Sequence, residues 1–287
     1  MRLIDDSSTR GSERLSSRGE LWENIEYGRA GAFSLRMDAH IPNGAGPFAA
    51  AIIVHGGGWV RGDRRLGVEP LFKPLSDGGF AWFSISYRLA SEITPSTVRG
   101  IPTSLFLGGA VQDVRQAIAH VKAHARYYKT DPNRIALIGE SAGAQLASMA
   151  ALKPGANGAV AAVVALYSPS DLVALAKTLP QIPGSVRRAV VGTVWADLLV
   201  AGLRNLSPIN YVRKDMPPFL LIHGTADTLV PFDQSVQMCR KILEAGASCE
   251  LYLVKGAGHG IRWWESGHLT AYKQHMIAWL GNQLREC

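Results

Sequence analysis

The stretch RIALIGESAGAQLASMA, residues 134–150, decides the fold of this chain. It reads as an apolar strand, a serine between two glycines, and a helix of small residues. A sharp strand-to-helix turn strains the backbone of its central residue, and bulky side chains two positions away on either side would collide. Glycine at 139 and 143 therefore predicts that Ser141 stands at a helix N-terminus, where the dipole and free N–H groups favour developing negative charge.

The rest of the chain alternates apolar strands with helices in the same way. The predicted strands are 22–27, 32–39, 50–55, 80–86, 134–139, 160–167, 219–223 and 250–254, and the predicted helices are 70–76, 111–128, 142–152, 232–244 and 268–284. The first two strands form a hairpin-like pair, and the other six alternate with helices. This pattern indicates an α/β fold with about eight strands in a mostly parallel sheet, flanked by helices on both faces.

The 287 residues fit a single domain, residues 21–287, preceded by a lead-in at 1–20 that we expect to be poorly ordered. Two insertions interrupt the alternation. Residues 90–109 are a predicted loop with two prolines, far longer than an ordinary connection. Residues 171–215 place mixed helical and loop sequence between two strands. Long segments of this kind often form the rim or lid of a site, so they predict a short cap.

The composition limits the possible partners. The chain is 47% hydrophobic and 18% charged, with a formal net charge of +7. Its basic residues are scattered and do not alternate with aromatics as they would along a nucleic-acid groove. No apolar run reaches the roughly 18 residues of a membrane span, and the first 20 residues lack the apolar core of a signal peptide. We therefore expect a small-molecule or polysaccharide-linked substrate, no nucleic acid and no membrane span; compartment and oligomeric state stay open.

The three cysteines, Cys239, Cys249 and Cys287, are too few and too unevenly spaced for a zinc site or a disulfide framework. Two unpaired thiols are the favoured interpretation of Cys239 and Cys249, and one bridge between them stays open. No cluster of histidine, cysteine and carboxylate residues has the spacing of a metal site. We expect neither a metal nor another cofactor.

A second glycine-rich motif, HGGGW at residues 55–59, follows a predicted strand. Acyl transfer requires backbone N–H groups that face the oxygen on which negative charge develops, and glycines let the backbone approach that oxygen without Cβ clashes. Gly57 and Gly58 are predicted to supply two donors of such an oxyanion hole. Ala142, which follows Ser141, is predicted to supply the third.

An acid and a base follow in the chain order that accompanies a serine of this kind. Asp227 comes just after strand 219–223, and His259 lies in the loop after strand 250–254. Because neighbouring parallel strands end at the same edge of a sheet, both side chains are predicted to reach Ser141. His259 would take the hydroxyl proton and later protonate the leaving group, while Asp227 would fix the imidazole tautomer and stabilise its charged form.

Other carboxylates and imidazoles are weaker alternatives for these roles. Asp233 and His268 belong to predicted helices, His223 ends inside a strand, and Asp171 lies at the mouth of an insertion. Glu140, beside the serine, is interpreted as a buried carboxylate that braces the turn.

Five motifs together resemble the hormone-sensitive-lipase-like carboxylesterases, and within them the bacterial feruloyl and acetyl-xylan esterase-like branch: HGGGW at 55–59, SYRL at 86–89, GESAG at 139–143, PPFLLIHGTADTLVP at 217–231 and GAGHG at 256–260. The resemblance covers about residues 45–285. It implies an α/β-hydrolase fold, a Ser/Asp/His triad, no cofactor and ester hydrolysis. One departure is the extended segment 91–107, which follows SYRL where members continue into a proline-rich stretch, and which bears on substrate specificity.

Four tryptophans are the expected substrate contacts: Trp59, Trp195, Trp263 and Trp264. Their flat indoles would stack on a phenolic acyl group or a sugar ring, although packing at a cleft explains them equally well. Short acyl or phenolic esters, such as acetyl or feruloyl esters, are therefore the favoured substrates. A lipase would need a larger apolar lid than residues 171–215 provide, and a peptidase or amidase would commonly need an extra domain; both stay as alternatives.

Overall fold

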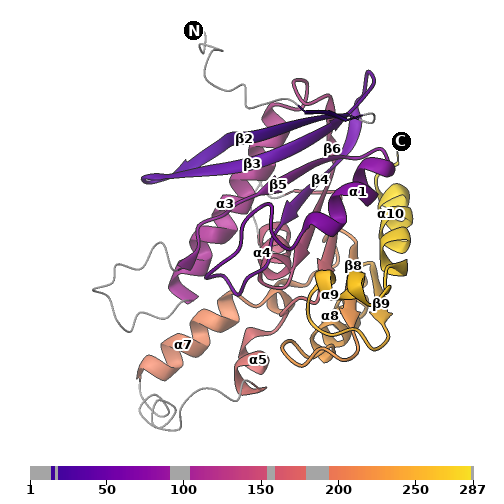
Figure 1. Ribbon diagram of the computed structural model, residues 1–287. Helices are drawn as coiled ribbons and strands as arrows, with labels where there is room; N and C mark the ends of the chain where they lie inside the picture. The colour runs from indigo at the N-terminus through magenta and orange to yellow at the C-terminus, as the bar shows by residue number, and fades with distance from the viewer. Residues whose placement is uncertain (1–13, 17–18, 91–103, 154–158, 179–193, 286–287) are drawn as a thin grey trace.

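The computed structural model describes residues 14–16, 19–90, 104–153, 159–178 and 194–285 of the chain (Figure 1). Within these ranges the strands form one sheet with the order β1-β2-β3-β5-β4-β6-β7-β8-β9. The strands are β1 (Arg14–Ser16), β2 (Gly19–Ala30), β3 (Phe33–Pro42), β4 (Phe48–Val54), β5 (Ala81–Ile85), β6 (Thr130–Glu140), β7 (Ala162–Leu166), β8 (Phe219–Gly224) and β9 (Cys249–Val254).

The sheet has an antiparallel end and a parallel body. Strands β1, β2 and β3 pair antiparallel with one another, and β3 pairs antiparallel with β5. From β5 to β9 every neighbouring pair is parallel. The prediction of two antiparallel strands followed by six parallel ones is therefore confirmed, and the short strand β1 is added at the edge.

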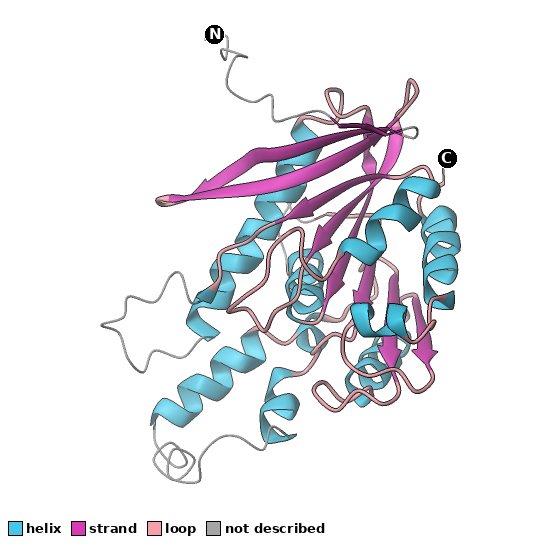
Figure 2. Cartoon of the chain, in the orientation of Figure 1, coloured by secondary structure: helices cyan, strands magenta, loops and turns pink. Residues whose placement is uncertain are grey.

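Helices cover both faces of the sheet, as Figure 2 shows. The helices α3, α4 and α8 pack on one face, while α1, α9 and α10 lie on the other. Their bounds are α1 (Glu69–Asp77), α3 (Ser104–Ala123), α4 (Ala142–Leu152), α8 (Asp233–Glu244), α9 (Ile261–Ser266) and α10 (Ala271–Gln283). No helix in the described ranges has the length and apolar character needed to cross a bilayer.

Strand β4 shows how two cores arise from one apolar run. Successive side chains of a strand point to opposite faces, so Ala50, Ile52 and Val54 join the core under α3, α4 and α8. The alternate residues of the same strand join the core under α1, α9 and α10. A strand that is buried on both faces reads as continuous apolar sequence rather than as alternation.

The two insertions are only partly described. Helix α3 begins at Ser104, so the end of the predicted loop 90–109 is helical instead, and residues 91–103 lie outside the described residues. Gly109 explains the difference: its carbonyl accepts a hydrogen bond from Arg88 at 2.9 Å, and a Cβ there would lie 3.1 Å from the guanidinium carbon. Glycine is typical of loops, but here it lies in a helix and leaves room for the close approach of Arg88.

The insertion at 171–215 contains three short elements at the carboxyl edge of the sheet (Figure 1). They are α5 (Leu172–Thr178), α7 (Val194–Asn205) and the 3-10 helix η2 (Pro208–Tyr211). Residues 179–193 lie outside the described residues. The expected lead-in at 1–20 also falls mostly outside them, although its last part contains β1 and the start of β2.

A disulfide joins Cys239 of α8 to Cys249, the first residue of β9, with Cα atoms 5.6 Å apart. This corrects the interpretation of the two residues as unpaired thiols. Helix α8 packs on β8 and β9, and a tight turn between α8 and β9 brings the two cysteines together. Their ten-residue separation alone does not reveal that proximity.

Candidate active site

The turn at Ser141 has the strained geometry that its sequence predicts. Ser141 has φ 50° and ψ −121°, a conformation that non-glycine residues rarely adopt. A Cβ on Gly139 would lie 2.5 Å from the Cα of Ala144, and one on Gly143 would lie 2.2 Å from the carbonyl oxygen of Val54. Both glycines are therefore required by close backbone contacts, and the turn presents Ser141 at the N-terminus of α4.

Two hydrogen bonds connect the three residues predicted to act together. The Nε2 atom of His259 lies 2.9 Å from Oγ of Ser141, and its Nδ1 atom lies 2.7 Å from Oδ2 of Asp227. An ionised carboxylate only accepts hydrogen bonds, so Nδ1 carries a proton and Nε2 is free to accept the one from the serine hydroxyl. This is the arrangement in which a serine hydroxyl can be deprotonated as it attacks.

Asp227 is held as a carboxylate. Its side chain is fully buried, and its Oδ1 atom accepts hydrogen bonds from the N–H groups of Leu229 and Val230, both at 2.9 Å. Burial by itself raises the pKa of Asp227, but hydrogen bonds from His223, His259 and the amide of Val230 outweigh burial and hold the pKa well below its ordinary value. The negative charge beside His259 therefore persists at neutral pH.

The predicted oxyanion loop lies against the turn. A Cβ on Gly56 would lie 3.2 Å from Cβ of Ser141, which places the loop beside the serine. Gly57 and Gly58 have φ of 113° and 62°, values open to glycine. Within the described ranges, the N–H groups of Gly57, Gly58 and Ala142 donate to no protein acceptor. Three such unpaired amides match the need of a substrate oxygen that becomes negative.

Glu140 connects the oxyanion loop to the His259 loop. Its Oε1 atom accepts a hydrogen bond from the N–H of Gly56 at 3.0 Å, and its Oε2 atom accepts one from the hydroxyl of Tyr167. The Tyr167 hydroxyl in turn accepts the N–H of Ile261 at 3.1 Å, and its ring meets the His259 ring edge-on at 4.7 Å. Burial raises the pKa of Glu140. The contacts agree with its interpretation as a carboxylate that braces the turn.

Sequence reasoning missed Gln145, which is completely buried in the first turns of α4. Its Oε1 atom accepts a hydrogen bond from the indole N–H of Trp59 at 3.0 Å, and its Nε2 atom donates one to the carbonyl of Leu206 at 2.7 Å. One amide therefore joins the predicted oxyanion loop, α4 and the insertion. Its position four residues after Ser141 was the only available signal.

The sequence patterns also did not predict a network of ion pairs around the buried side chain of Asp38. Asp38 of β3 accepts hydrogen bonds from Arg64 at 3.0 Å and from Arg65, and its side chain is 7% exposed. The carbonyl of Arg64 accepts a hydrogen bond from the hydroxyl of Ser84 on β5. The network anchors the segment after Gly57 and Gly58 to the antiparallel end of the sheet.

The structure separates the four tryptophans. Trp264 is 1% exposed, and its indole N–H donates to the carbonyl of Gly258 at 2.8 Å. It is a core residue, which corrects its prediction as a substrate contact, since no face of its ring is free. Trp59 is half-buried and bonded to Gln145. Trp263 is 75% exposed. The side chain of Trp195 lies outside the described part of the chain.

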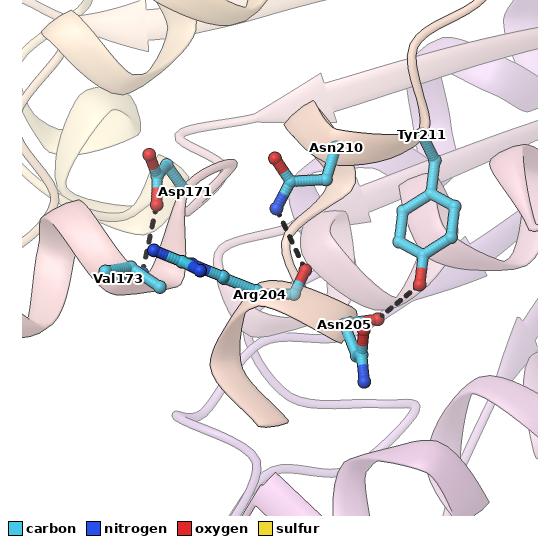
Figure 3. Close-up of a pocket in the computed structure, with 6 residues that line it drawn as sticks. All are labelled: Asp171, Val173, Arg204, Asn205, Asn210 and Tyr211. Carbon is cyan, nitrogen blue, oxygen red and sulfur yellow. Dashed lines mark hydrogen bonds between the residues drawn. The ribbon is translucent and has the colours of Figure 1, made fainter. Parts of the chain in front are cut away.

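A separate cavity of about 480 Å³ opens within the insertion (Figure 3). It is lined by Asp171, Val173, Arg204, Asn205, Asn210 and Tyr211. Several of its polar groups bond to one another: Asn210 donates to the carbonyl of Arg204 at 3.0 Å, and the Tyr211 hydroxyl donates to the carbonyl of Asn205 at 2.9 Å. None of its lining residues belongs to the Ser141 site, so the cavity is distinct from that site.

Comparisons with known proteins identify what this chain is similar to. The family model BD-FAE matches residues 37–242. The probable carboxylic ester hydrolase LipM of Mycobacterium tuberculosis is 32% identical over 73% of this chain and 48% of LipM. Esterase LipC of the same organism is 30% identical over 83% of this chain and 59% of LipC. The chain thus spans about half the length of the curated relatives it matches.

A solved structure gives more complete coverage. A truncated form of a carbohydrate esterase from gut microbiota is similar to this chain with a TM-score of 0.73 and 26% sequence identity. The match covers 94% of this chain and 98% of that one. The α/β-hydrolase architecture expected from the sequence is therefore shared with an esterase over nearly the whole of both chains.

Proposed function

The chain belongs to the BD-FAE family. We propose that it hydrolyses carboxylic esters through an acyl-enzyme formed on Ser141. The observation that carries the proposal is the pair of hydrogen bonds from Ser141 to His259 at 2.9 Å and from His259 to Asp227 at 2.7 Å. The esterases among its relatives and structural neighbours support the same chemistry.

Acylation begins when Oγ of Ser141 attacks the ester carbonyl carbon while Nε2 of His259 takes the hydroxyl proton. The carbonyl π electrons move to the oxygen, which becomes an oxyanion held by the N–H groups of Gly57, Gly58 and Ala142. The buried charge of Asp227 stabilises the imidazolium. When the tetrahedral intermediate collapses, the C–O bond to the alcohol breaks and His259 gives its proton to the leaving alkoxide.

Deacylation repeats these steps with water in place of the serine. His259 takes a proton from the attacking water, and the same amides hold the second oxyanion. The bond between the acyl carbon and Oγ of Ser141 then breaks, and His259 returns the proton to the serine. The products are a carboxylic acid and an alcohol, and all three side chains regain their starting state.

Short acyl or phenolic esters are the proposed substrate class. Trp263 lies four residues after His259, and with 75% of its surface exposed it offers a flat apolar face for an aromatic acyl group or a sugar ring. The structural neighbour described as a carbohydrate esterase supports an ester attached to a carbohydrate. A lipase with a long acyl pocket and an amidase of the same fold are the alternatives.

A substrate panel tests the proposal. We expect turnover of p-nitrophenyl acetate, methyl ferulate and acetylated xylan, with rates that fall as the acyl chain of p-nitrophenyl esters lengthens. An aminoacyl anilide included in the same panel should not be cleaved. Rates that rise with chain length would favour the lipase, and cleavage of the anilide alone would favour the amidase.

A further inference from the structure

His223, at the end of β8, has no part in the acyl-transfer steps described above, yet its side chain is fully buried beside the acid. Its Nδ1 atom lies 2.7 Å from Oγ of Ser235 on α8. Its Nε2 atom lies 2.9 Å from the carbonyl oxygen of Val230 and 3.3 Å from Oδ2 of Asp227. Every polar atom of the ring therefore faces a partner.

The contacts of His223 determine where its hydrogen lies. A backbone carbonyl and an ionised carboxylate both accept hydrogen bonds and donate none, so Nε2 must carry a hydrogen, which lies between the carbonyl oxygen of Val230 at 2.9 Å and Oδ2 of Asp227 at 3.3 Å. The hydroxyl of Ser235 can donate to Nδ1. The ring thus presents a fixed N–H to the acid.

The two oxygens of Asp227 have different surroundings. Oδ1 accepts from two backbone amides of its own loop, whereas Oδ2 lies between two imidazoles, His259 at 2.7 Å and His223 at 3.3 Å. The hydrogen bond to Val230 also fixes the loop that carries Asp227. His223 therefore contacts both the oxygen that faces His259 and the backbone that supports it.

We propose that His223 is a positioning residue that holds the Asp227 carboxylate against His259 and shares its negative charge. The proposal rests on the proposed esterase function, in which His259 is the base. Without the Nε2–H group of His223, His259 is the remaining imidazole that stabilises the negative charge on Oδ2 of Asp227. The imidazolium form of His259 is then more strongly stabilised, so its titration moves to higher pH.

Among the residues that the structure describes, two other ionisable groups interact with His259, and neither changes in the experiment. Tyr167 meets the imidazole edge-on at 4.7 Å, and Glu140 interacts electrostatically with it. A shift in the titration of His259 on replacement of His223 is therefore assigned to Asp227.

Three variants separate the donor from the volume of the ring. His223→Phe fills the space but removes the N–H donor, His223→Gln keeps an N–H donor, and Ser235→Ala removes the partner of Nδ1 while leaving Nε2–H in place. For each folded variant the dependence of kcat/KM on pH is measured with p-nitrophenyl acetate. The titration of His259 is followed by ¹⁵N NMR of histidine-labelled protein, a measurement that needs no turnover.

For His223→Phe we expect the acid limb of kcat/KM and the NMR titration of His259 to move up by about half a pH unit. We also expect kcat/KM above the limb to fall about tenfold, as for the loss of one hydrogen bond to a charged group. His223→Gln and Ser235→Ala should keep the wild-type limb. An unmoved limb in His223→Phe, whether or not the rate falls, would overturn the proposal.

Two further measurements test the proposal if a variant does not fold or if the protein hydrolyses no ester. If His223→Phe does not fold, the ¹⁵N spectrum of the wild-type protein is used: a protonated Nε2 on His223 supports the proposal, and an unprotonated one overturns it. If the wild-type protein hydrolyses no ester, the esterase function fails, while the NMR titration of His259 still tests the contact between His223 and Asp227.

Discussion

The indole N–H of Trp59 donates a hydrogen bond to Oε1 of Gln145 at 3.0 Å, and the same amide donates to the carbonyl of Leu206. Trp59 directly follows Gly57 and Gly58, the proposed oxyanion donors, and has φ 64°, so its backbone is strained as well as anchored. The amide of Gln145 therefore fixes the end of the proposed oxyanion loop to the helix that begins after Ser141.

Trp59→Phe should remove this anchor while keeping an aromatic ring. The buried Oε1 of Gln145 loses its donor, so we expect the free energy of unfolding to fall by about 1 kcal/mol. We also expect kcat to fall severalfold with little change in KM, because a loosened oxyanion loop stabilises the transition state less. Urea unfolding and steady-state kinetics measure the two effects.

Trp22→Phe is the matched control for that variant. The indole of Trp22 also donates a hydrogen bond, to Glu20 at 3.1 Å, but on β2, at the antiparallel end of the sheet. It should change stability and leave kcat unaltered. An unchanged kcat in Trp59→Phe would contradict the role assigned to the Trp59–Gln145 contact.

Gly143→Ala tests the close packing of the turn. The added Cβ would lie 2.2 Å from the carbonyl oxygen of Val54 and 2.3 Å from that of His55, so the end of β4 must shift. We expect a destabilisation of about 2 kcal/mol, as for other overpacked sites, and a loss of most activity. Thermal unfolding and the rate on p-nitrophenyl acetate check both.

Gly281→Ala is the matched control, because an added Cβ at this glycine meets no close contact. Gly281 lies in α10, and beyond the neighbouring backbone of that helix no described atom lies within 4 Å of an added Cβ. The same substitution there should stabilise the protein by about 0.5–1 kcal/mol, since alanine favours helix and glycine does not. Equal effects at the two positions would show that the contacts around Gly143 do not matter.

The depressed pKa of Asp227 makes stability depend on pH in a defined direction. Because the pKa is lower in the folded state than in the unfolded one, the ionised carboxylate stabilises the fold above the unfolded value of about 3.9, and that contribution is lost as pH falls below it. Asp227→Asn removes it. We expect the difference in unfolding free energy between wild type and variant to be about 2 kcal/mol at pH 7 and to shrink towards pH 3.

Asp215→Asn controls for the removal of a carboxylate. The side chain of Asp215 is 85% exposed, and it pairs with Arg213 at 3.3 Å. Surface pairs of this kind contribute little, so this variant should show no comparable dependence on pH. A constant difference between wild type and Asp227→Asn from pH 7 to pH 3 would argue against a depressed pKa.

The disulfide between Cys239 and Cys249 should stabilise the protein without taking part in the reaction. It closes a loop of about ten residues between α8 and β9, and the loss of such a closure costs roughly 3 kcal/mol in the chain-entropy description. Thiol titration of the unfolded chain should find one free thiol before reduction and three after it. Three thiols before reduction would contradict the bridge.

The sequence predicted the parts of the fold and site that depend on local pattern. The alternation of strands and helices gave the parallel body of the sheet, and three short motifs led to Ser141, Asp227 and His259, whose side chains the structure joins by hydrogen bonds. Each of these residues stands at the exit of a strand. The parallel arrangement of the strands then brings the three residues to one edge of the sheet, so no other sequence signal is needed to predict that they lie together.

The contacts that support the site could not be predicted in this way. Gln145 meets Leu206, and Asp38 meets Arg64, across long separations in sequence. Hydrophobic periodicity carries no signal for such pairs, because any polar residue at either position would leave the pattern unchanged. The burial of Trp264 was missed for the same reason: an aromatic side chain near a motif can face the cleft or the core.

The rate of Ser141→Ala on p-nitrophenyl acetate shows whether the hydroxyl of Ser141 is required for ester hydrolysis. The hydroxyl is the proposed nucleophile, and alanine at this position keeps the backbone and the packing of the turn. We expect a protein that unfolds like wild type and a kcat/KM lower by at least about a thousandfold. A folded variant that keeps a tenth of the wild-type rate would show that Ser141 is not the nucleophile.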